Sequence, residues 1–196
     1  MVGNAPIREL ITMQYVLIIL LSILACVTYG VLHDQVTARI CVEYFTIGHP
    51  PLVDTNSPTL IGLAWGVIAT WWVGVILGVP LSIASRVGSM PKRNAASLVK
   101  PIVVLMLFCA VCAVIAGTIG HALATAEKVW LLEPLASRVP QDRHVAFLTD
   151  LWAHNASYIS GFLGGIILIV VVLAKRWGTA CESYAHVVGG SPAPST

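Results

Sequence analysis

Four long apolar stretches constrain the fold of this chain more than any other feature. Each is long enough to cross a bilayer as a helix, which takes about 20 residues. The stretches are residues 11–32, 59–85, 101–124 and 158–175. Hydrophobic residues make up 57% of the chain and charged residues 10%, whereas soluble domains carry about a quarter charged residues. The sequence therefore predicts an all-α integral membrane protein, in which residues 1–180 form one four-transmembrane-helix bundle.

The few charges exclude one function class and predict an orientation. The net charge is +2 and no basic cluster is interleaved with aromatic residues, so nucleic-acid binding is not expected. The side that carries the termini has seven basic residues and two acids, and the other side has four basic residues and seven acids. Because basic residues concentrate on the cytoplasmic side of membranes, both termini are predicted to be cytoplasmic, in a bacterial inner (plasma) membrane.

Prolines mark the predicted limits of the spans. Proline is favoured in the first turn of a helix. Pro6 precedes the first stretch, Ser57-Pro58 opens the second, and Pro101 opens the third. Pro80 lies inside the second stretch, where it predicts a kink.

The two segments outside the membrane, residues 33–57 and 125–157, are predicted to form an ordered outer cap. In residues 35–44, apolar and polar residues alternate with a period of two, which predicts a short strand. From Pro140 onward the apolar spacing predicts an amphipathic helix that lies on the bilayer or leads into the fourth span. Residues 181–196 are predicted to be a flexible cytoplasmic tail.

Small residues recur at intervals of four in the second span. They are Gly62, Gly66, Thr70, Gly74 and Gly78. Because lipid tails are as apolar as leucine, helices associate in membranes through such small residues, which let two backbones approach closely. The first functional hypothesis is therefore an accessory or partner-binding subunit of a membrane complex. Its partners would be the lipid bilayer and other membrane chains, or further copies of this chain.

Three histidines are predicted to share one depth: His33, His121 and His154. At about 1.5 Å per helical residue, each lies about 14–18 Å from the middle of its span, and half the hydrocarbon thickness is about 15 Å. All three also lie on the small-residue faces of their helices, so they are expected to point into protein near the outer membrane boundary.

Imidazoles with flanking carboxylates are the ligands that zinc and non-haem iron use. The second hypothesis is therefore a metal-binding protein or metal-dependent enzyme, with a site made of His33, His121, Asp150 and His154. Asp34 and Glu43 are alternative carboxylates near His33. A water bound to such a metal could serve hydrolysis.

Two further interpretations of the histidines remain open. Histidines on facing helices can clamp a haem, so the third hypothesis is an electron-transfer subunit with haem between His33 and His121. The histidines could equally be hydrogen-bonded polar residues at the point where helices leave the membrane.

Cys109 and Cys112 form a CxxC inside the third span. The helix count and this spacing resemble the membrane thiol oxidoreductases of the vitamin K epoxide reductase and DsbB kinds. That resemblance implies a thiol pair that works beside a quinone together with outer-loop cysteines. The pair here lies at mid-span and Cys41 is the only outer cysteine, so the thiols are instead expected to be small buried residues. Cys41 is expected to be a free thiol or an intermolecular link.

Overall fold

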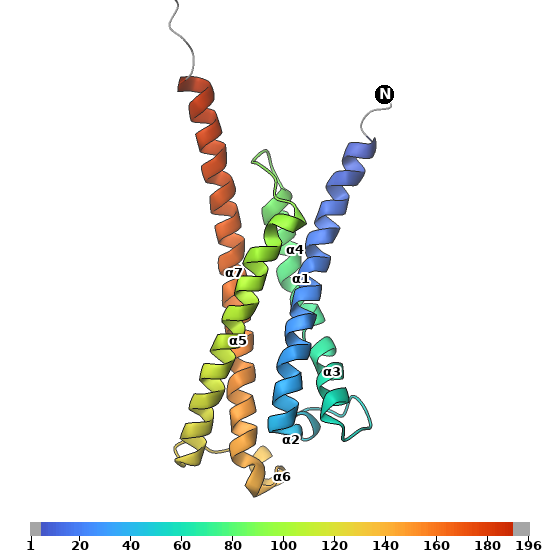
Figure 1. The fold of residues 1–196 in the computed structure, drawn as a ribbon, viewed down its shortest axis with the longest axis vertical. Helices are drawn as coiled ribbons and strands as arrows, with labels where there is room; N and C mark the ends of the chain where they lie inside the picture. Colours follow the sequence, from blue (N-terminus) through green and yellow to red (C-terminus); the bar gives the residue numbers. More distant parts are fainter. Residues whose placement is uncertain (1–4, 190–196) are drawn as a thin grey trace, which may run out of the picture.

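The computed structural model describes residues 5–189, with side chains from 12 to 184, and this part of the chain is helical without a strand (Figure 1). The elements are α1 (Ala5–Ile40), α2 (Val42–Thr46), α3 (Pro58–Ile68), α4 (Trp71–Arg86), α5 (Ala95–Thr125), α6 (Leu135–Arg138), the 3₁₀ turn η1 (Gln141–Arg143) and α7 (His144–Gly189). Four stretches are long and apolar enough to cross a membrane: Thr12–Ile40, Pro58–Arg86, Ala95–Thr125 and Gln141–Tyr184. The predicted four-helix membrane bundle is confirmed.

The strand predicted at residues 35–44 is wrong, because α1 continues to Ile40 and α2 begins at Val42. The buried residues of this stretch repeat with the helical period: Asp34, Thr37, Ala38 and Cys41. Val36 and Ile40 are exposed. The buried face of this helix carries Asp34, Thr37 and small residues, whereas Arg39 is exposed together with the large apolar residues, so the alternation does not separate two faces of a strand.

The second span consists of two helices. Ser57 caps α3 by accepting a hydrogen bond from the backbone N–H of Leu60. The interruption falls at Ala69 and Thr70, and Pro80, where a kink was predicted, lies inside α4. The hydroxyl of Thr70 donates to the carbonyl of Gly66, so the Thr70 amide bonds to Val67 instead. A side chain that competes for a helix carbonyl in this way loosens the helix.

The third and fourth spans are longer than predicted. Asn94 caps α5 by accepting from the backbone N–H of Ser97, so α5 begins at Ala95 and Pro101 lies inside it. No proline interrupts residues 144–189, and the amphipathic segment leads directly into the fourth span. Helix α7 also continues past residue 181, where the tail was predicted to begin; residues 190–196 lie outside the described residues.

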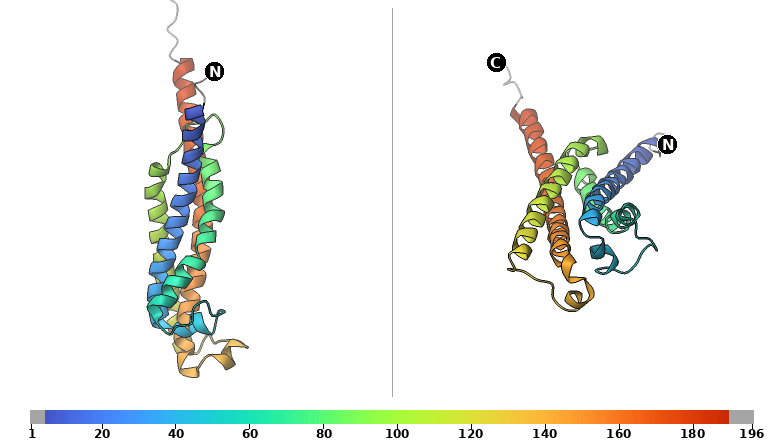
Figure 2. Two further views of the ribbon diagram at one scale, coloured as in Figure 1. Left: turned by 90° about the vertical axis from the view of Figure 1, so that its right-hand side faces the viewer. Right: turned by 60° about the horizontal axis from the view of Figure 1, so that its bottom comes forward.

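The helices form two sets. Helix α1 packs along α3 and α4, and α5 packs along α7. The sets meet where α4 contacts α7 and where α1 contacts α5. Helices α1 and α5 approach each other toward the end that carries the chain termini and diverge toward the end with α2 and α6 (Figures 1 and 2).

The glycine row of the second span packs inside the chain. A Cβ on Gly66 would lie 2.5 Å from the Cα of Val31, and one on Gly74 would lie 2.5 Å from the Cα of Ile23. Gly62 and Gly78 also face the α1 backbone or its short side chains. These glycines therefore bring α3 and α4 against α1.

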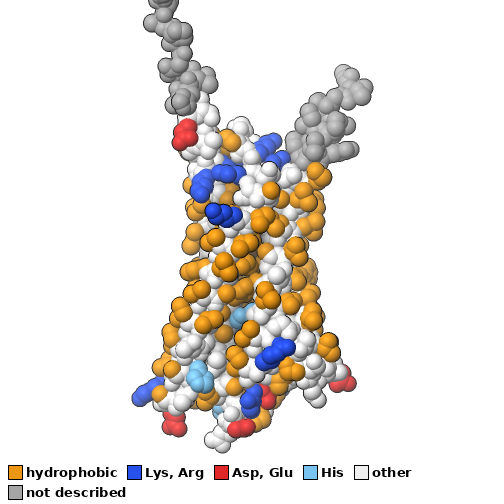
Figure 3. All heavy atoms as spheres, in the orientation of Figure 1, with side chains coloured by type: hydrophobic (Ala, Val, Ile, Leu, Met, Phe, Trp, Pro, Cys, Tyr) orange, Lys and Arg blue, Asp and Glu red, His pale blue; other side chains and the backbone are white. Residues whose placement is uncertain are grey.

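The charged ends of the molecule are separated by a hydrophobic belt (Figure 3). In the view of Figure 3, lysine and arginine gather at the end with the termini, and most acidic side chains lie at the other end. There α2 folds back onto the start of α7, and Tyr44 and Phe45 pack with Phe147. Arg143 donates to the Glu43 carboxylate at 3.1 Å and to the Ile40 carbonyl at 2.9 Å. These contacts fix the cap over the histidines.

Candidate metal centre

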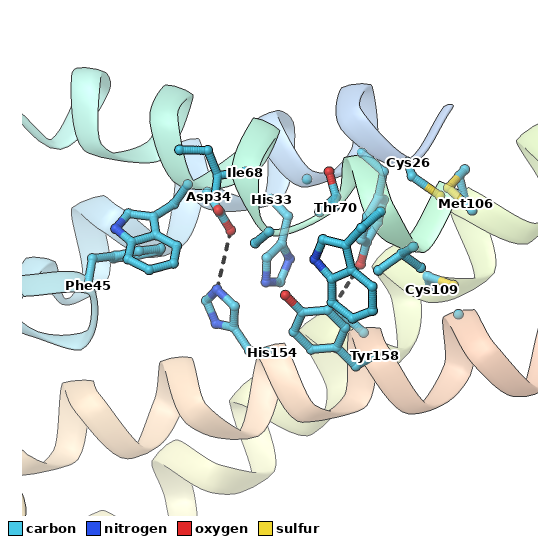
Figure 4. A pocket seen from close by; sticks show the side chains of 18 of the residues that line it. Cys26, His33, Asp34, Phe45, Ile68, Thr70, Met106, Cys109, His154 and Tyr158 are labelled. Atoms are coloured by element: carbon cyan, nitrogen blue, oxygen red, sulfur yellow. Dashed lines mark hydrogen bonds and ion pairs between the residues drawn. The ribbon is translucent and has the colours of Figure 1, made fainter. Parts of the chain in front are cut away.

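Three titratable side chains from two helices converge under the cap. His33 and Asp34 come from α1 and His154 from α7 (Figure 4). Each offers one ligand atom within 4.8 Å of the other two. Asp34 and His154 are buried, and Nε2 of His154 lies 3.2 Å from Oδ1 of Asp34. Among the residues described, no other group of three such ligands comes this close.

The hydrogen bonds of His154 define where protons lie. Its Nδ1 is 2.8 Å from the carbonyl of Asp150, and a carbonyl only accepts, so Nδ1 carries a proton. A neutral ring would then present an unprotonated Nε2 to Asp34. The contact at 3.2 Å therefore contains one shared proton, on His154 or on Asp34. A cation could take the place of that proton.

Nε2 of His33 is buried and has no hydrogen-bond partner. The His33 ring meets the His154 ring edge to face at 4.5 Å between centroids, and Tyr29 stacks on it at 5.7 Å. Buried polar atoms without partners are uncommon because losing water without a replacement costs about 1–3 kcal/mol. This nitrogen is therefore a candidate metal ligand.

Tyr44 of the cap covers the centre and was not predicted from the sequence. Its ring stacks on His154 at 4.3 Å between centroids. Burial, and then the neighbouring Tyr158 and acidic side chains, raise the pKa of Tyr44 well above its usual value. The phenol therefore stays neutral. The aromatic pair Tyr44-Phe45 directly after the first span was a signal in the sequence. The direction in which the Tyr44 ring points was not predictable, because it depends on α2 being a helix.

A cavity of about 350 Å³ opens beside the three side chains. His33, Asp34 and His154 line its polar end, and His49 lies there too. The cavity continues between the helices to a sulfur-rich end: Cys26, Met106 and Cys109 (Figure 4). A ligand bound by the histidines would therefore adjoin a cavity whose other walls are mainly apolar.

His121 lies apart from this group. It is exposed on α5, and its Nδ1 is 3.3 Å from the hydroxyl of Thr149 on α7. It lines a second, larger depression of about 760 Å³ between α1 and α5, which His33 also lines from the opposite helix. The haem predicted between His33 and His121 would have to occupy that depression.

The other predicted carboxylates also lie outside the group. Asp150 is wholly buried, neither of its carboxylate oxygens has a hydrogen-bond partner, and it lines the depression between α1 and α5. Glu43 is paired with Arg143. Of the four side chains predicted as metal ligands, the structure brings together His33 and His154, and it adds the alternative carboxylate Asp34 in place of His121 and Asp150.

All five cysteines are free thiols. Cys41 is fully buried, donates a hydrogen bond to Glu43 and has a pKa raised to about 12, chiefly by burial, so it is neither reactive nor available for an intermolecular link. Cys109 is buried, Cys112 and Cys26 are partly buried, and Cys26 and Cys109 line the same cavity.

Comparisons with protein-family models, with curated proteins and with solved structures found no match to this chain.

Proposed function

We propose that this chain is a membrane-embedded metal-binding protein that holds one divalent ion, zinc or iron, through His33, Asp34 and His154. The observation that carries the proposal is the buried, unpartnered Nε2 of His33 beside the His154–Asp34 pair. A buried nitrogen without a partner is unfavourable, and a metal ion would satisfy it.

The spacing of the ligand atoms supports an ion of this size. Around a tetrahedral zinc with bonds of about 2.0–2.2 Å, ligand atoms lie about 3.3–3.6 Å apart. The separation of His154 Nε2 from Asp34 Oδ1 is 3.2 Å, and all three ligand atoms lie within 4.8 Å of one another. The hydrogen bond from His154 Nδ1 to the Asp150 carbonyl fixes the ring so that Nε2 faces the site, as is usual for metal-bound histidine.

Three protein ligands leave a coordination position for water or substrate, which distinguishes catalytic from structural zinc sites. That position would open into the 350 Å³ cavity. A metal there could polarise a carbonyl or lower the pKa of a bound water, so the proposal extends to a metal-dependent enzyme. Two histidines and one carboxylate are also the ligand set of non-haem iron enzymes, so both metals fit.

The role of a partner-binding subunit stays a prediction with a weaker basis. It relied on glycines available to other chains, whereas Gly62, Gly66, Gly74 and Gly78 pack against α1 of the same chain. The distribution of basic residues supports both termini in the cytoplasm, which would place the metal centre at the outer face of the membrane.

Element analysis of protein purified without chelator tests the proposal. We expect one zinc or iron per chain, and we expect His33→Ala to lose it. The matched control is His121→Ala, a histidine at a similar depth outside the group, which should retain the metal. Cobalt added to metal-free protein should give the visible absorption of a tetrahedral site in the wild type and not in His33→Ala.

Two results would overturn the metal proposal. One is a metal content well below one per chain both after purification and after incubation with zinc or iron. The other is an unchanged metal content in His33→Ala protein, provided that this variant elutes as the same monodisperse species as the wild type. Loss of metal in His121→Ala instead would support the site predicted from the sequence, in which His121 is a ligand.

A further inference from the structure

Basic side chains gather at the end of the bundle that carries the chain termini, far from the proposed metal centre (Figure 3). Five of them, here called the basic patch, come from the end of α4, the loop between α4 and α5, and the C-terminal part of α7: Arg86, Lys92, Arg93, Lys175 and Arg176. Both ion pairs of the described residues lie near the cap instead. Among acids with described side chains, only Glu182 follows on this part of α7, and it is exposed. The basic patch therefore carries a positive charge that the chain itself does not balance.

The loop that contributes to the basic patch is held in place by backbone contacts around Arg176. The buried guanidinium of this residue donates to four carbonyls, those of Ala84, Val87, Met90 and Pro91. The Arg93 N–H donates to the Ser85 carbonyl at 2.9 Å, and Nη1 of Arg86 donates to the Arg93 carbonyl at 3.1 Å. Because these acceptors are neutral carbonyls, the loop is ordered and its charges remain unpaired. A binding surface that is ordered in advance loses less entropy when a ligand binds.

Three cations of the basic patch are available to a ligand. Lys92 and Lys175 are exposed and Arg93 is partly exposed. Within the described part of the chain, their side chains make no hydrogen bond or ion pair. Each can therefore bind an anion without giving up a contact within the protein.

The surroundings of the basic patch place it at the depth of lipid headgroups. Ile83 on α4 and Leu173 on α7 are large apolar residues, lie within one helical turn of the patch, and are exposed. Trp177, also exposed, directly follows Arg176, and tryptophan is enriched where membranes meet water. In Figure 3 the basic side chains border the hydrophobic belt. A ligand here would touch cations at one end and apolar side chains at the other, which is the chemistry of a phospholipid rather than of a soluble anion.

We propose that the basic patch binds the headgroup of an anionic phospholipid, whose phosphate lies between Lys92, Arg93 and Lys175. The acyl chains run along the exposed apolar side chains of α4 and α7, which pack against each other. A zwitterionic phospholipid has the same phosphate but also a cation, which the patch repels. Basic residues at a membrane surface each strengthen the binding of anionic lipid about fivefold. This proposal does not depend on a metal at the other end of the molecule.

Native mass spectrometry of the whole, delipidated protein in a neutral detergent tests the proposal. The probes are dioleoyl phosphatidylglycerol, which is anionic, and dioleoyl phosphatidylcholine, which has the same chains and no net charge. At low ionic strength we expect the first phosphatidylglycerol to bind about tenfold more tightly than the first phosphatidylcholine. Added salt should reduce this preference, because it screens exposed charges.

A pair of double variants locates the site. Lys92→Gln with Lys175→Gln removes two exposed cations of the basic patch and no hydrogen bond. It should weaken the binding of phosphatidylglycerol about fivefold or more and leave that of phosphatidylcholine unchanged. The matched control, Lys128→Gln with Arg138→Gln, removes two exposed cations near the cap and changes the net charge equally. It should keep the preference of the wild type.

Three results would overturn the proposal. Equal binding of the two lipids by the wild type would mean that the patch does not recognise a headgroup charge. An equal loss in both double variants would mean that the net charge of the protein, and not the basic patch, attracts the lipid. Displacement of phosphatidylglycerol by inorganic phosphate, but not by chloride at the same ionic strength, would assign the patch to a soluble anion.

Discussion

Buried polar side chains in this bundle either have complete hydrogen bonds or lack partners. Arg176 belongs to the first kind: its guanidinium donates to the carbonyls of Ala84, Val87, Met90 and Pro91. Nε2 of His33 and the carboxylate of Asp150 belong to the second. Groups whose bonds are complete hold the fold together, and those without partners are the places where a ligand gains most.

The first prediction concerns Arg176, which is 1% exposed and holds the loop between α4 and α5. Arg176→Lys keeps the charge but cannot reach four carbonyls with one ammonium group. Each carbonyl left without a partner costs about 1–3 kcal/mol. We expect trypsin to cut this loop, after Lys92 or Arg93, about fivefold faster or more in detergent solution.

The control for the loop is Lys175→Ala, which removes an exposed neighbouring charge. It should leave the cleavage rate of the loop unchanged. An Arg176→Lys protein that resists trypsin like the wild type would mean that charge alone, rather than the four-carbonyl geometry, holds the loop.

The sequence predicts a common depth for three histidines, and the structure brings two of them together. Depth follows from counting residues along a helix, and His33 and His154 do meet, at 4.5 Å between ring centroids. Which way a side chain points depends on which helices pair. Because α5 pairs with α7, His121 meets Thr149 instead of the other two histidines.

At the scale of helices, close backbone approach decides the packing of α1 against α3 and α4. The second prediction tests it with Gly66→Ala. The added Cβ would lie 2.5 Å from the Cα and 2.6 Å from the N of Val31, so the helices must separate. Overpacking of this kind costs about 1–3 kcal/mol, and we expect a lower melting temperature in detergent.

Gly178→Ala in α7 is the matched control, because nothing lies within 4 Å of its added Cβ. There the better helix propensity of alanine, worth up to about 1 kcal/mol, should leave the melting temperature unchanged or raise it. If both substitutions act alike, intrinsic propensity and not interhelical contact governs the effect.

The third prediction concerns the ion pair between Glu43 of α2 and Arg143 of η1, the turn directly before α7. Burial alone would raise the pKa of Glu43, but hydrogen bonds from its own backbone N–H, from Arg143 and from Cys41 outweigh it, and the pKa lies below its usual 4.5. The stabilisation is therefore complete above the unfolded-state pKa and is lost as the pH falls through the folded-state value.

Glu43→Gln should accordingly lower the free energy of unfolding at pH 7, by less than about 1 kcal/mol because the pair is partly exposed. The difference from the wild type should shrink as the pH falls below 4.5. Glu127→Gln, at an exposed position, should match the wild type throughout the titration. A difference for Glu43→Gln that grows toward acid pH would contradict the assigned direction of the pKa.

The errors in helix limits share one cause. Period-two alternation at residues 35–44 predicts a strand, and Pro101 predicts a helix start, under rules that hold in water. In a membrane, large apolar residues face outward, so the pattern of residues 34–41 follows the helix surface that faces protein. Proline inside a membrane helix is also tolerated, since neighbouring groups satisfy the freed carbonyl.

The whole molecule consists of two helix sets that meet incompletely, and two spaces between the helices arise from that. The cavity beside His33 lies where α1, α4 and α7 converge, and the larger depression lies where α1 and α5 diverge. Composition and span lengths predicted four helices, but neither space was predictable, because the pairing of helices depends on contacts between residues far apart in the chain.

The last prediction concerns the placement of the whole molecule in the membrane. Both ends of the described chain lie at one end of the bundle, together with most lysine and arginine (Figures 1 and 3). Since positive charge is retained on the cytoplasmic side, Cys181 should be inside and the cap outside. Cys181 is exposed, whereas Cys41 is buried and cannot report on its side.

A membrane-impermeant maleimide applied to intact spheroplasts should leave the wild type unlabelled until the membrane is permeabilised, and Cys181→Ser should remove that labelling. A second reporter, Asp54→Cys in the Cys181→Ser background, places an exposed thiol in the cap loop and should react in intact spheroplasts. Labelling of Cys181 in intact spheroplasts would show that the orientation in the membrane is opposite to the predicted one. The proposed centre at His33, Asp34 and His154 would then face the cytoplasm, so this experiment also tests which compartment would supply the proposed ion.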